Sequence, residues 1–157
     1  MNESFKELTF SPKTYVVWKN EVEISKIMDP SMWQTATNKV LSYIQRQNLK
    51  LAGKMSALYL SWDEAAGKTV LAIGFSVEGV SQINDAELSL VSTPESKAVM
   101  AEGHGAYDNL RNVHDALKNN LAEKGVHWTM AIEEYVVTGM DNPDSHNWLT
   151  NIFYLYE

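Results

Sequence analysis

The feature that most constrains the fold of this chain is the order of its predicted elements, which occurs twice. Runs rich in β-branched and aromatic residues predict strands, and apolar residues spaced three and four apart predict helices. The predicted order is strand 14–22, helix from Pro30, strands 57–62 and 69–77, strands 87–91 and 97–101, a helix ending near Gly125, and strands 129–137 and 150–156. The sequence therefore reads as β-α-β-β repeated, with pseudo-repeats at about 12–80 and 85–157.

Both predicted helices have one apolar stripe and a recognisable start or stop signal. Asp29 is suited to an N-cap, and Pro30 to the first helical position after it. The stripes that we expect to face the core are Trp33, Ala36, Val40 and Ile44 in the first helix, and Leu110, Val113, Leu117 and Leu121 in the second.

Two helices among about eight strands provide too few crossovers for a doubly wound parallel sheet. We therefore expect an α+β fold: an antiparallel sheet with both helices on one face. A pseudo-dyad between the two halves would leave a ligand cleft between them. At 157 residues the chain is expected to form a single domain over 1–157.

The charge of the chain disfavours some classes of partner. Thirteen Lys and Arg against twenty Asp and Glu give a net charge of −7, and no basic cluster is present, so we expect no direct contact with nucleic acid. A negative field favours organic cations or basic protein partners, although solubility alone also explains it. The sequence has no cysteine, no apolar run of membrane-spanning length and a polar start, which favours a cytoplasmic protein away from membranes.

No motif for a cofactor or a metal is visible. The chain contains no glycine-rich phosphate loop and no nucleophile elbow, so no cofactor is expected. The four histidines show no metal-ligand spacing, and each is interpreted as a surface or helix-face residue: His104, His114, His127 and His146.

The most unusual residue is Glu133, in the middle of the predicted strand 129–137. Alternation places Glu133 and Tyr135 on one face and the mostly apolar set Met130, Ile132, Glu134 and Val136 on the other. We expect the apolar set to pack on the helices, with Lys118 or Lys124 near Glu134, and Glu133 to face the cleft. Ligand binding, a solvated strand face and neutralisation by Arg46, Lys54 or Lys97 are the three explanations for such a carboxylate.

Aromatic residues favour the ligand-binding explanation. Tyr59 is pseudo-symmetric to Glu133 in the other half, so both are expected to line one cleft. The other candidate lining residues are Tyr15, Trp62, Phe75, Tyr107, Tyr135 and Trp148, each of which could also be a core residue. A carboxylate surrounded by aromatic rings suits an organic cation, because each ring face adds about 0.5–2 kcal/mol.

Several short motifs occur in the order found in a known family. They are Gly103-His104-Gly105-Ala106-Tyr107 at a helix start, Glu133-Glu134-Tyr135 in a strand, Asn142-Pro143 and Trp148 in a loop, Thr150-Asn151-Ile152-Phe153 in the closing strand, and Leu58-Tyr59 in the first half. Over nearly the whole chain, this pattern resembles the GyrI-like small-molecule-binding domain, the AraC/MerR-type effector-binding domain of the SOUL-like superfamily.

The resemblance implies a duplicated β-α-β-β fold with a central cleft. In multidrug-responsive members, the glutamate of this strand pairs with cationic lipophilic drugs, which implies that role for Glu133, with Tyr135, Tyr107 and Tyr59 as pocket positions. Many relatives carry a helix-turn-helix domain used in transcription regulation. About a dozen residues precede the first predicted strand here, so we expect none in this sequence.

Three functions follow as hypotheses. The first is a stand-alone protein that binds aromatic or amphipathic drug-like cations. The second is an interaction module, resembling the gyrase-inhibitor member, that acts on a protein partner; a homodimer is also compatible with the sequence. The third is a small-molecule hydrolase with Glu133 as general base, for which the sequence shows no third catalytic residue.

Overall fold

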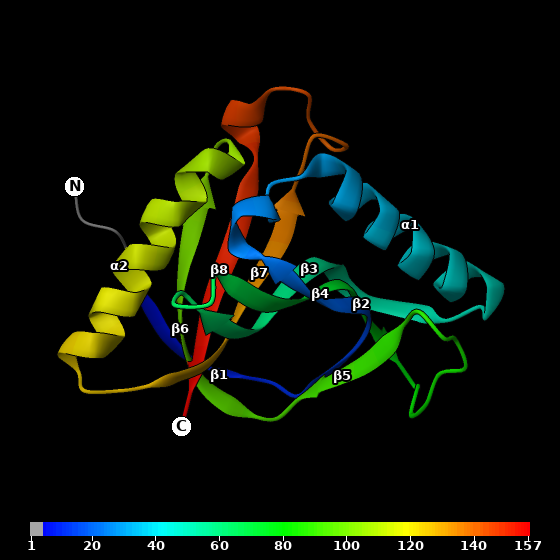
Figure 1. Cartoon of the computed structure of the whole chain (residues 1–157), viewed down its shortest axis with the longest axis horizontal. Coiled ribbons are helices and arrows are strands. Elements are labelled where there is room, and N and C mark those ends of the chain that lie inside the picture. Colours follow the sequence, from blue (N-terminus) through cyan, green and yellow to red (C-terminus); the bar gives the residue numbers. More distant parts are fainter. Residues whose placement is uncertain (1–4) are drawn as a thin grey trace. The chain divides into compact units, whose positions relative to one another are not determined.

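The computed structural model describes residues 5–157, which divide into two compact units. One unit is Pro12–Pro94, here called the α1 unit. The other combines residues 5–11 with Glu95–Glu157 and is called the α2 unit. Each contains one long helix and four neighbouring antiparallel strands, and the colours of Figure 1 follow these elements along the chain.

The α1 unit contains the first β-α-β-β repeat and one further strand. Its elements are β2 (Lys13–Glu23), η1 (Ile24–Lys26), α1 (Pro30–Arg46), β3 (Lys50–Asp63), β4 (Lys68–Glu78) and β5 (Ser89–Thr93). The strand order is β3-β4-β2-β5, antiparallel throughout. The β3–β4 turn is the predicted one: Gly67 has a φ of 69°, which favours glycine, and the Asp63 carboxylate accepts a hydrogen bond from the Ala66 amide.

Helix α1 begins as the sequence predicts. The Asp29 carboxylate accepts a hydrogen bond from the Ser31 amide at 3.0 Å, and Pro30 occupies the first helical position. The helix packs on β2 and β4. Its buried residues are Ala36, Val40, Tyr43 and Ile44, and the last three share a core with Val16, Val77 and Leu88. The predicted stripe is confirmed, with two differences: Trp33 is only half-buried, and Tyr43, next to Ile44, is buried as well.

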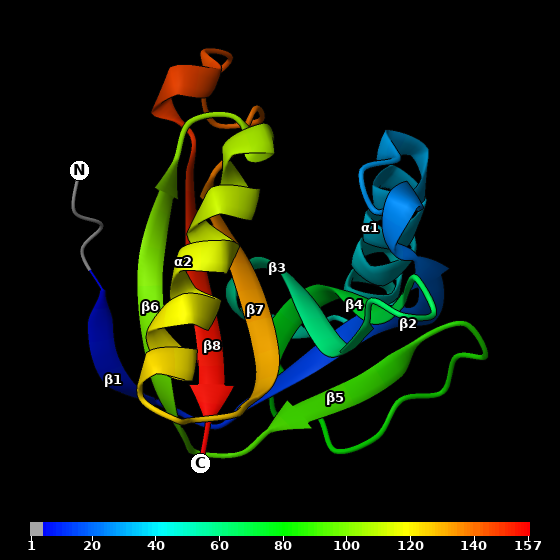
Figure 2. The same cartoon turned by 60° about the vertical axis from the view of Figure 1, so that its left-hand side comes forward.

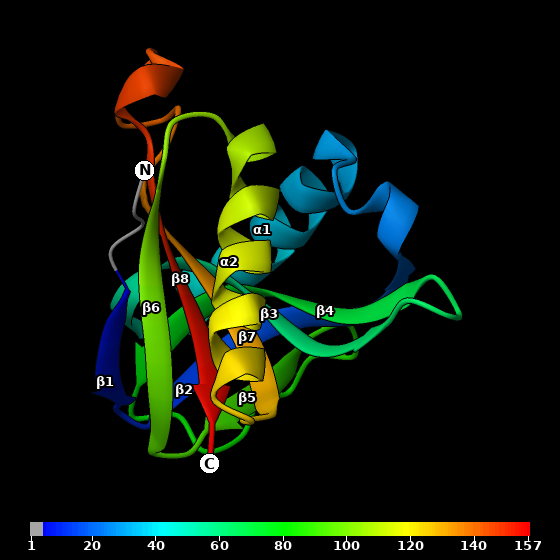
Figure 3. The ribbon, with the colours of Figure 1, turned by 90° about the vertical axis from the view of Figure 1, so that its left-hand side faces the viewer.

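The α2 unit contains the second β-α-β-β repeat and an additional edge strand. Its elements are β1 (Lys6–Phe10), β6 (Ser96–His104), η2 (Tyr107–Asn109), α2 (Leu110–Glu123), β7 (Trp128–Val137), η3 (Ser145–Asn147) and β8 (Leu149–Tyr156). The strand order is β1-β6-β8-β7, again antiparallel. Figures 2 and 3 show α2 lying along β6 and β8, on which it packs with Leu110, Val113, Leu117 and Leu121.

The duplicated β-α-β-β order and the α+β class are confirmed, whereas two strand assignments differ from prediction. β1 was not predicted: its five residues pair with β6, from Lys6 opposite Met100 to Phe10 opposite Ser96, and such long-range pairing has no local signal. The strand predicted at 87–91 is β5, which pairs with β2 of the α1 unit. The single-domain assignment and the cleft between the halves stay predictions.

Candidate functional site

The candidate site is centred on Glu133, which is only 5% exposed in the middle of β7. The neighbouring strand β8 fixes its position, because Glu133 lies opposite Ile152 and Tyr135 opposite Thr150. An isolated ionised carboxylate is very unfavourable at this depth, so its partners decide whether it can remain charged.

Both carboxylate oxygens of Glu133 have hydrogen-bond partners. The Tyr135 hydroxyl donates to Oε1 at 2.6 Å, and Nε2 of His114 lies 2.6 Å from Oε2. Nδ1 of the same imidazole lies 2.6 Å from the Tyr154 hydroxyl. A continuous polar chain therefore runs from Tyr135 through Glu133 and His114 to Tyr154. The carboxylate therefore has one phenolic donor, Tyr135, and one imidazole partner, His114.

The face on which Glu133 lies differs from the prediction. His114 belongs to α2, so Glu133 faces the helix of its own unit and not the side away from it. The error came from assigning the apolar set of β7 to the helix side. Ala131, Ile132 and Glu133 are all buried, so both faces of this strand are covered and its polarity does not distinguish them.

Glu134 lies on the opposite face from Glu133, as strand alternation requires. Its Oε1 accepts a hydrogen bond from the Asn151 side-chain amide at 3.3 Å, and the residue is half-buried. Of the two lysines proposed near Glu134, Lys124 instead pairs with Glu7 at 2.5 Å, and Nζ of Lys118 lies 6.0 Å from the centre of the Trp128 ring.

Aromatic rings extend the polar chain in both directions. On one side, Tyr107 lies edge-on to Tyr135 at 5.7 Å and tilted against Trp148 at 5.0 Å, both measured between ring centres. On the other side, Tyr154 makes edge contacts with His114 at 5.5 Å and with Trp128 at 5.1 Å. Three of the predicted pocket residues, Tyr107, Tyr135 and Trp148, are thus brought together with Glu133.

The negative charge of Glu133 affects the tyrosines around it. Burial, followed by the charges of Glu133 and Asp141, raises the pKa of Tyr107. Burial, followed by Glu133 and Asp115, raises the pKa of Tyr154 well above its usual range. Both phenols therefore keep their protons at neutral pH.

The remaining predicted site residues belong to the α1 unit. Tyr59 and Trp62 of β3 are in edge contact, with ring centres 5.9 Å apart. Phe75 packs against the core under α1. Tyr15 is buried on the opposite face of β2 from Val16, which belongs to that core. Contact of these four residues with a ligand stays a prediction.

Sequence reasoning missed two members of the polar chain, His114 and Tyr154. His114 follows Leu110 by four residues and precedes Leu117 by three, so helical spacing placed it beside the apolar stripe. Tyr154 is two residues from Ile152 on the same strand face. Those two spacings were the available signals, and neither by itself identifies a partner for Glu133.

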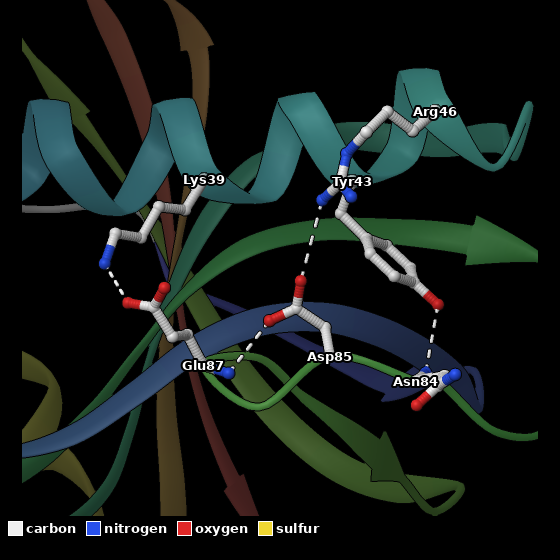
Figure 4. A network of polar contacts seen from close by, with 6 residues as sticks. All are labelled: Lys39, Tyr43, Arg46, Asn84, Asp85 and Glu87. Atoms are coloured by element: carbon white, nitrogen blue, oxygen red, sulfur yellow. Dashed lines mark hydrogen bonds and ion pairs between the residues drawn. The ribbon is translucent and has the colours of Figure 1, made fainter.

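A second polar cluster lies in the α1 unit, shown in Figure 4. Arg46 pairs with Asp85 at 3.6 Å, Lys39 pairs with Glu87, and the Tyr43 hydroxyl accepts from the Asn84 amide at 3.2 Å. These contacts tie α1 to the segment before β5 and border a surface pocket of about 250 Å³. Because its cations and anions are paired with each other, we interpret the cluster as a structural contact that holds α1 against the segment before β5, and not as a ligand site.

Among the described residues, 5–157, no group of three or more His, Asp or Glu side chains is arranged to hold a metal ion. None of the helices in this part of the chain has the length and apolar character needed to cross a bilayer.

Comparison with solved structures identifies the fold. The C-terminal domain of EcmrR superposes with a TM-score of 0.84 at 18% identity, covering all of this chain and 99% of that domain. EcmrR in a DNA complex superposes with a TM-score of 0.82 at 18% identity, covering 98% of this chain, which spans only 57% of the EcmrR chain.

Two other neighbours extend the comparison. SAV2435, solved bound to tetraphenylphosphonium, has a TM-score of 0.73 at 14% identity, covering 98% of this chain and 94% of the other. A hydrolase from Listeria innocua has a TM-score of 0.65 at 8% identity, covering 99% and 92%. No family model and no curated protein matches the sequence. The chain thus has the fold of the EcmrR C-terminal domain and of SAV2435, in agreement with the fold that the GyrI-like resemblance implies.

Proposed function

We propose that this protein binds hydrophobic organic cations, with Glu133 as the counter-charge and aromatic rings as the surrounding surface. The observation that carries the proposal is a carboxylate 5% exposed, hydrogen-bonded by Tyr135 and His114, at the centre of a continuous series of rings. Such a group offers a fixed negative charge in a poorly solvated place, where attraction to a cation is stronger than in water.

Two further observations support the same function. The chain carries a net charge of −7, which raises the local concentration of cations. SAV2435, which shares the fold, was solved with tetraphenylphosphonium, a hydrophobic cation without any hydrogen-bond donor. A ligand of that chemistry is held by charge and by apolar contacts, including ring contacts, rather than by hydrogen bonds, and Glu133 and its neighbouring rings would supply both.

The test is titration calorimetry with tetraphenylphosphonium on the wild type, Glu133→Gln and Glu134→Gln. We expect Glu133→Gln to weaken binding at least tenfold, about 1.4 kcal/mol. Glu134→Gln is the matched control: it removes a charge one residue away on the opposite strand face, and its dissociation constant should stay within about threefold of the wild type.

A neutral ligand of similar shape, triphenylphosphine oxide, separates charge recognition from simple hydrophobic binding. It should bind the wild type far more weakly than the phosphonium does, and Glu133→Gln should reduce the difference. Equal affinity of the wild type for both ligands, or equal loss in the two glutamate variants, would refute the charge-pairing mechanism.

Hydrolysis is a second candidate, because the structure supplies the third polar residue that the sequence did not identify. His114 lies against Glu133, and Tyr135 lies on the carboxylate's other oxygen, so a base and a potential proton donor are adjacent. Steady hydrolysis of a strained electrophile such as an epoxide, abolished in Glu133→Ala, would support this candidate. Absence of turnover by the wild type would exclude it for that substrate class.

A further inference from the structure

His114 contacts the same carboxylate, Glu133, that would pair with a bound cation. Its Nε2 is 2.6 Å from Oε2 of Glu133, and its side chain is only 16% exposed. Its other nitrogen, Nδ1, is 2.6 Å from the Tyr154 hydroxyl. Both ring nitrogens are therefore held by polar partners, and the ring is fixed relative to the carboxylate.

This geometry satisfies two protonation states of His114 without any movement. In the neutral ring, Nε2–H donates to Glu133 while Nδ1 accepts the Tyr154 proton, which leaves one net negative charge on the pair. In the protonated ring, both nitrogens donate and the Tyr154 oxygen accepts from Nδ1–H, so the imidazolium neutralises the carboxylate. The Tyr154 hydroxyl can serve as donor or acceptor because its proton is retained.

We infer that His114 is the internal competitor of the organic cation, so that a proton on His114 and a cation at Glu133 exclude each other. This inference rests on the proposed function and adds regulation of the same site. Histidine is the side chain that ordinarily changes charge between pH 5 and 8. Cation affinity should therefore rise with pH across this interval and fall in acid.

Glu133 is an acid that contacts His114 from the sheet. On β8 the facing titratable group is Tyr154, and on β7 they are Glu133 and Tyr135. On β6 the residues level with Thr150, Ile152 and Tyr154 are Gly103, Ala101 and Val99, which carry no charge. Along α2 itself the nearest charged residues are Arg111, Asp115 and Lys118, and Tyr107 precedes the helix.

The experiment measures tetraphenylphosphonium affinity at about pH 7.5 and about pH 5.5, an interval that spans ordinary histidine titration. This ligand has no ionisable group, so any change comes from the protein. For the wild type we expect binding at least fivefold weaker at the lower pH. At an intermediate pH, calorimetry in two buffers of different ionisation enthalpy should show proton release on binding.

His114→Gln is the informative variant, because glutamine keeps a neutral N–H for Glu133 and cannot take up a proton. Whatever the level of its affinity relative to the wild type, that affinity should be the same at the two pH values, and binding should release no proton. The matched control is His104→Gln. His104 also lies against a glutamate, Glu102, at 3.0 Å, but it is 70% exposed, and the variant should keep the wild-type pH dependence.

The outcomes separate this inference from the function on which it rests. Wild-type affinity that is constant between the two pH values overturns the inference and leaves cation binding intact. A full pH dependence retained in His114→Gln also overturns it. Failure of the wild type to bind the phosphonium at either pH overturns the proposed function and, with it, the inference.

Discussion

Two buried threonines on strands offer a direct test of the hydrogen bonding in this structure. Thr150 of β8 and Thr69 of β4 are each 1% exposed. The Thr69 hydroxyl donates to the Ser61 carbonyl at 2.6 Å. The Thr150 hydroxyl, which lies opposite Tyr135 on the face that carries Glu133, has no hydrogen-bond partner among residues 5–157. Valine has the same shape as threonine but no hydroxyl, so it removes only the polar group.

The two Thr→Val substitutions should change stability in opposite directions. In Thr69→Val the hydrogen bond from the Thr69 hydroxyl to the Ser61 carbonyl is lost, which should cost about 1–2 kcal/mol. In Thr150→Val no hydrogen bond is lost and an unpaired buried hydroxyl disappears, which should stabilise the ligand-free protein by about 1 kcal/mol. Strand propensity favours valine at both positions, so it does not account for the difference.

The assay is urea unfolding of the ligand-free wild type and both variants, analysed with a common slope. The free energies of unfolding of the two variants should differ by roughly 2–3 kcal/mol, with Thr150→Val the more stable. If Thr150→Val is destabilised as much as Thr69→Val, the Thr150 hydroxyl has a partner, such as a bound water, and the reasoning is wrong.

Two further predictions concern packing and alkaline stability. Gly74→Ala should lower the free energy of unfolding, measured in urea, by about 3 kcal/mol or more, because the added Cβ would lie 1.9 Å from the Val16 carbonyl oxygen and neither backbone can move away. In the control variant Gly53→Ala the added Cβ meets only the rotatable Ser76 hydroxyl, so the loss of stability should be far smaller. A similar loss in both variants would contradict this prediction. Burial raises the pKa of Tyr154 in the folded state, so the folded protein holds this proton more tightly than the unfolded chain. The stability that this proton contributes is complete below about pH 10 and is lost as pH rises further, so the free energy of unfolding of the wild type should fall more steeply there than that of Tyr154→Phe. Parallel plots of the two free energies against pH would contradict this prediction.

The helices and the repeated order of elements were available from the sequence, because their signals are local. Asp29 and Pro30 mark the start of α1 within two residues, and the second apolar stripe recurs at the helical period through α2. Strand alternation likewise determined that the adjacent Glu133 and Glu134 point to opposite faces. Two β-α-β-β runs then led to the α+β class without any knowledge of distant contacts.

The partners of Glu133 were decided only by the tertiary structure. Alternation divides a strand into two faces but does not say which of them the helix covers. Contrast between polar and apolar faces normally answers that question, and β7 lacks it because Ala131, Ile132 and Glu133 are all buried. His114 is 19 residues from Glu133 along the chain, and Tyr154 is 40 residues from His114. Such contacts form when α2 packs across the sheet, so the polar chain that defines the candidate site exists only in the folded unit.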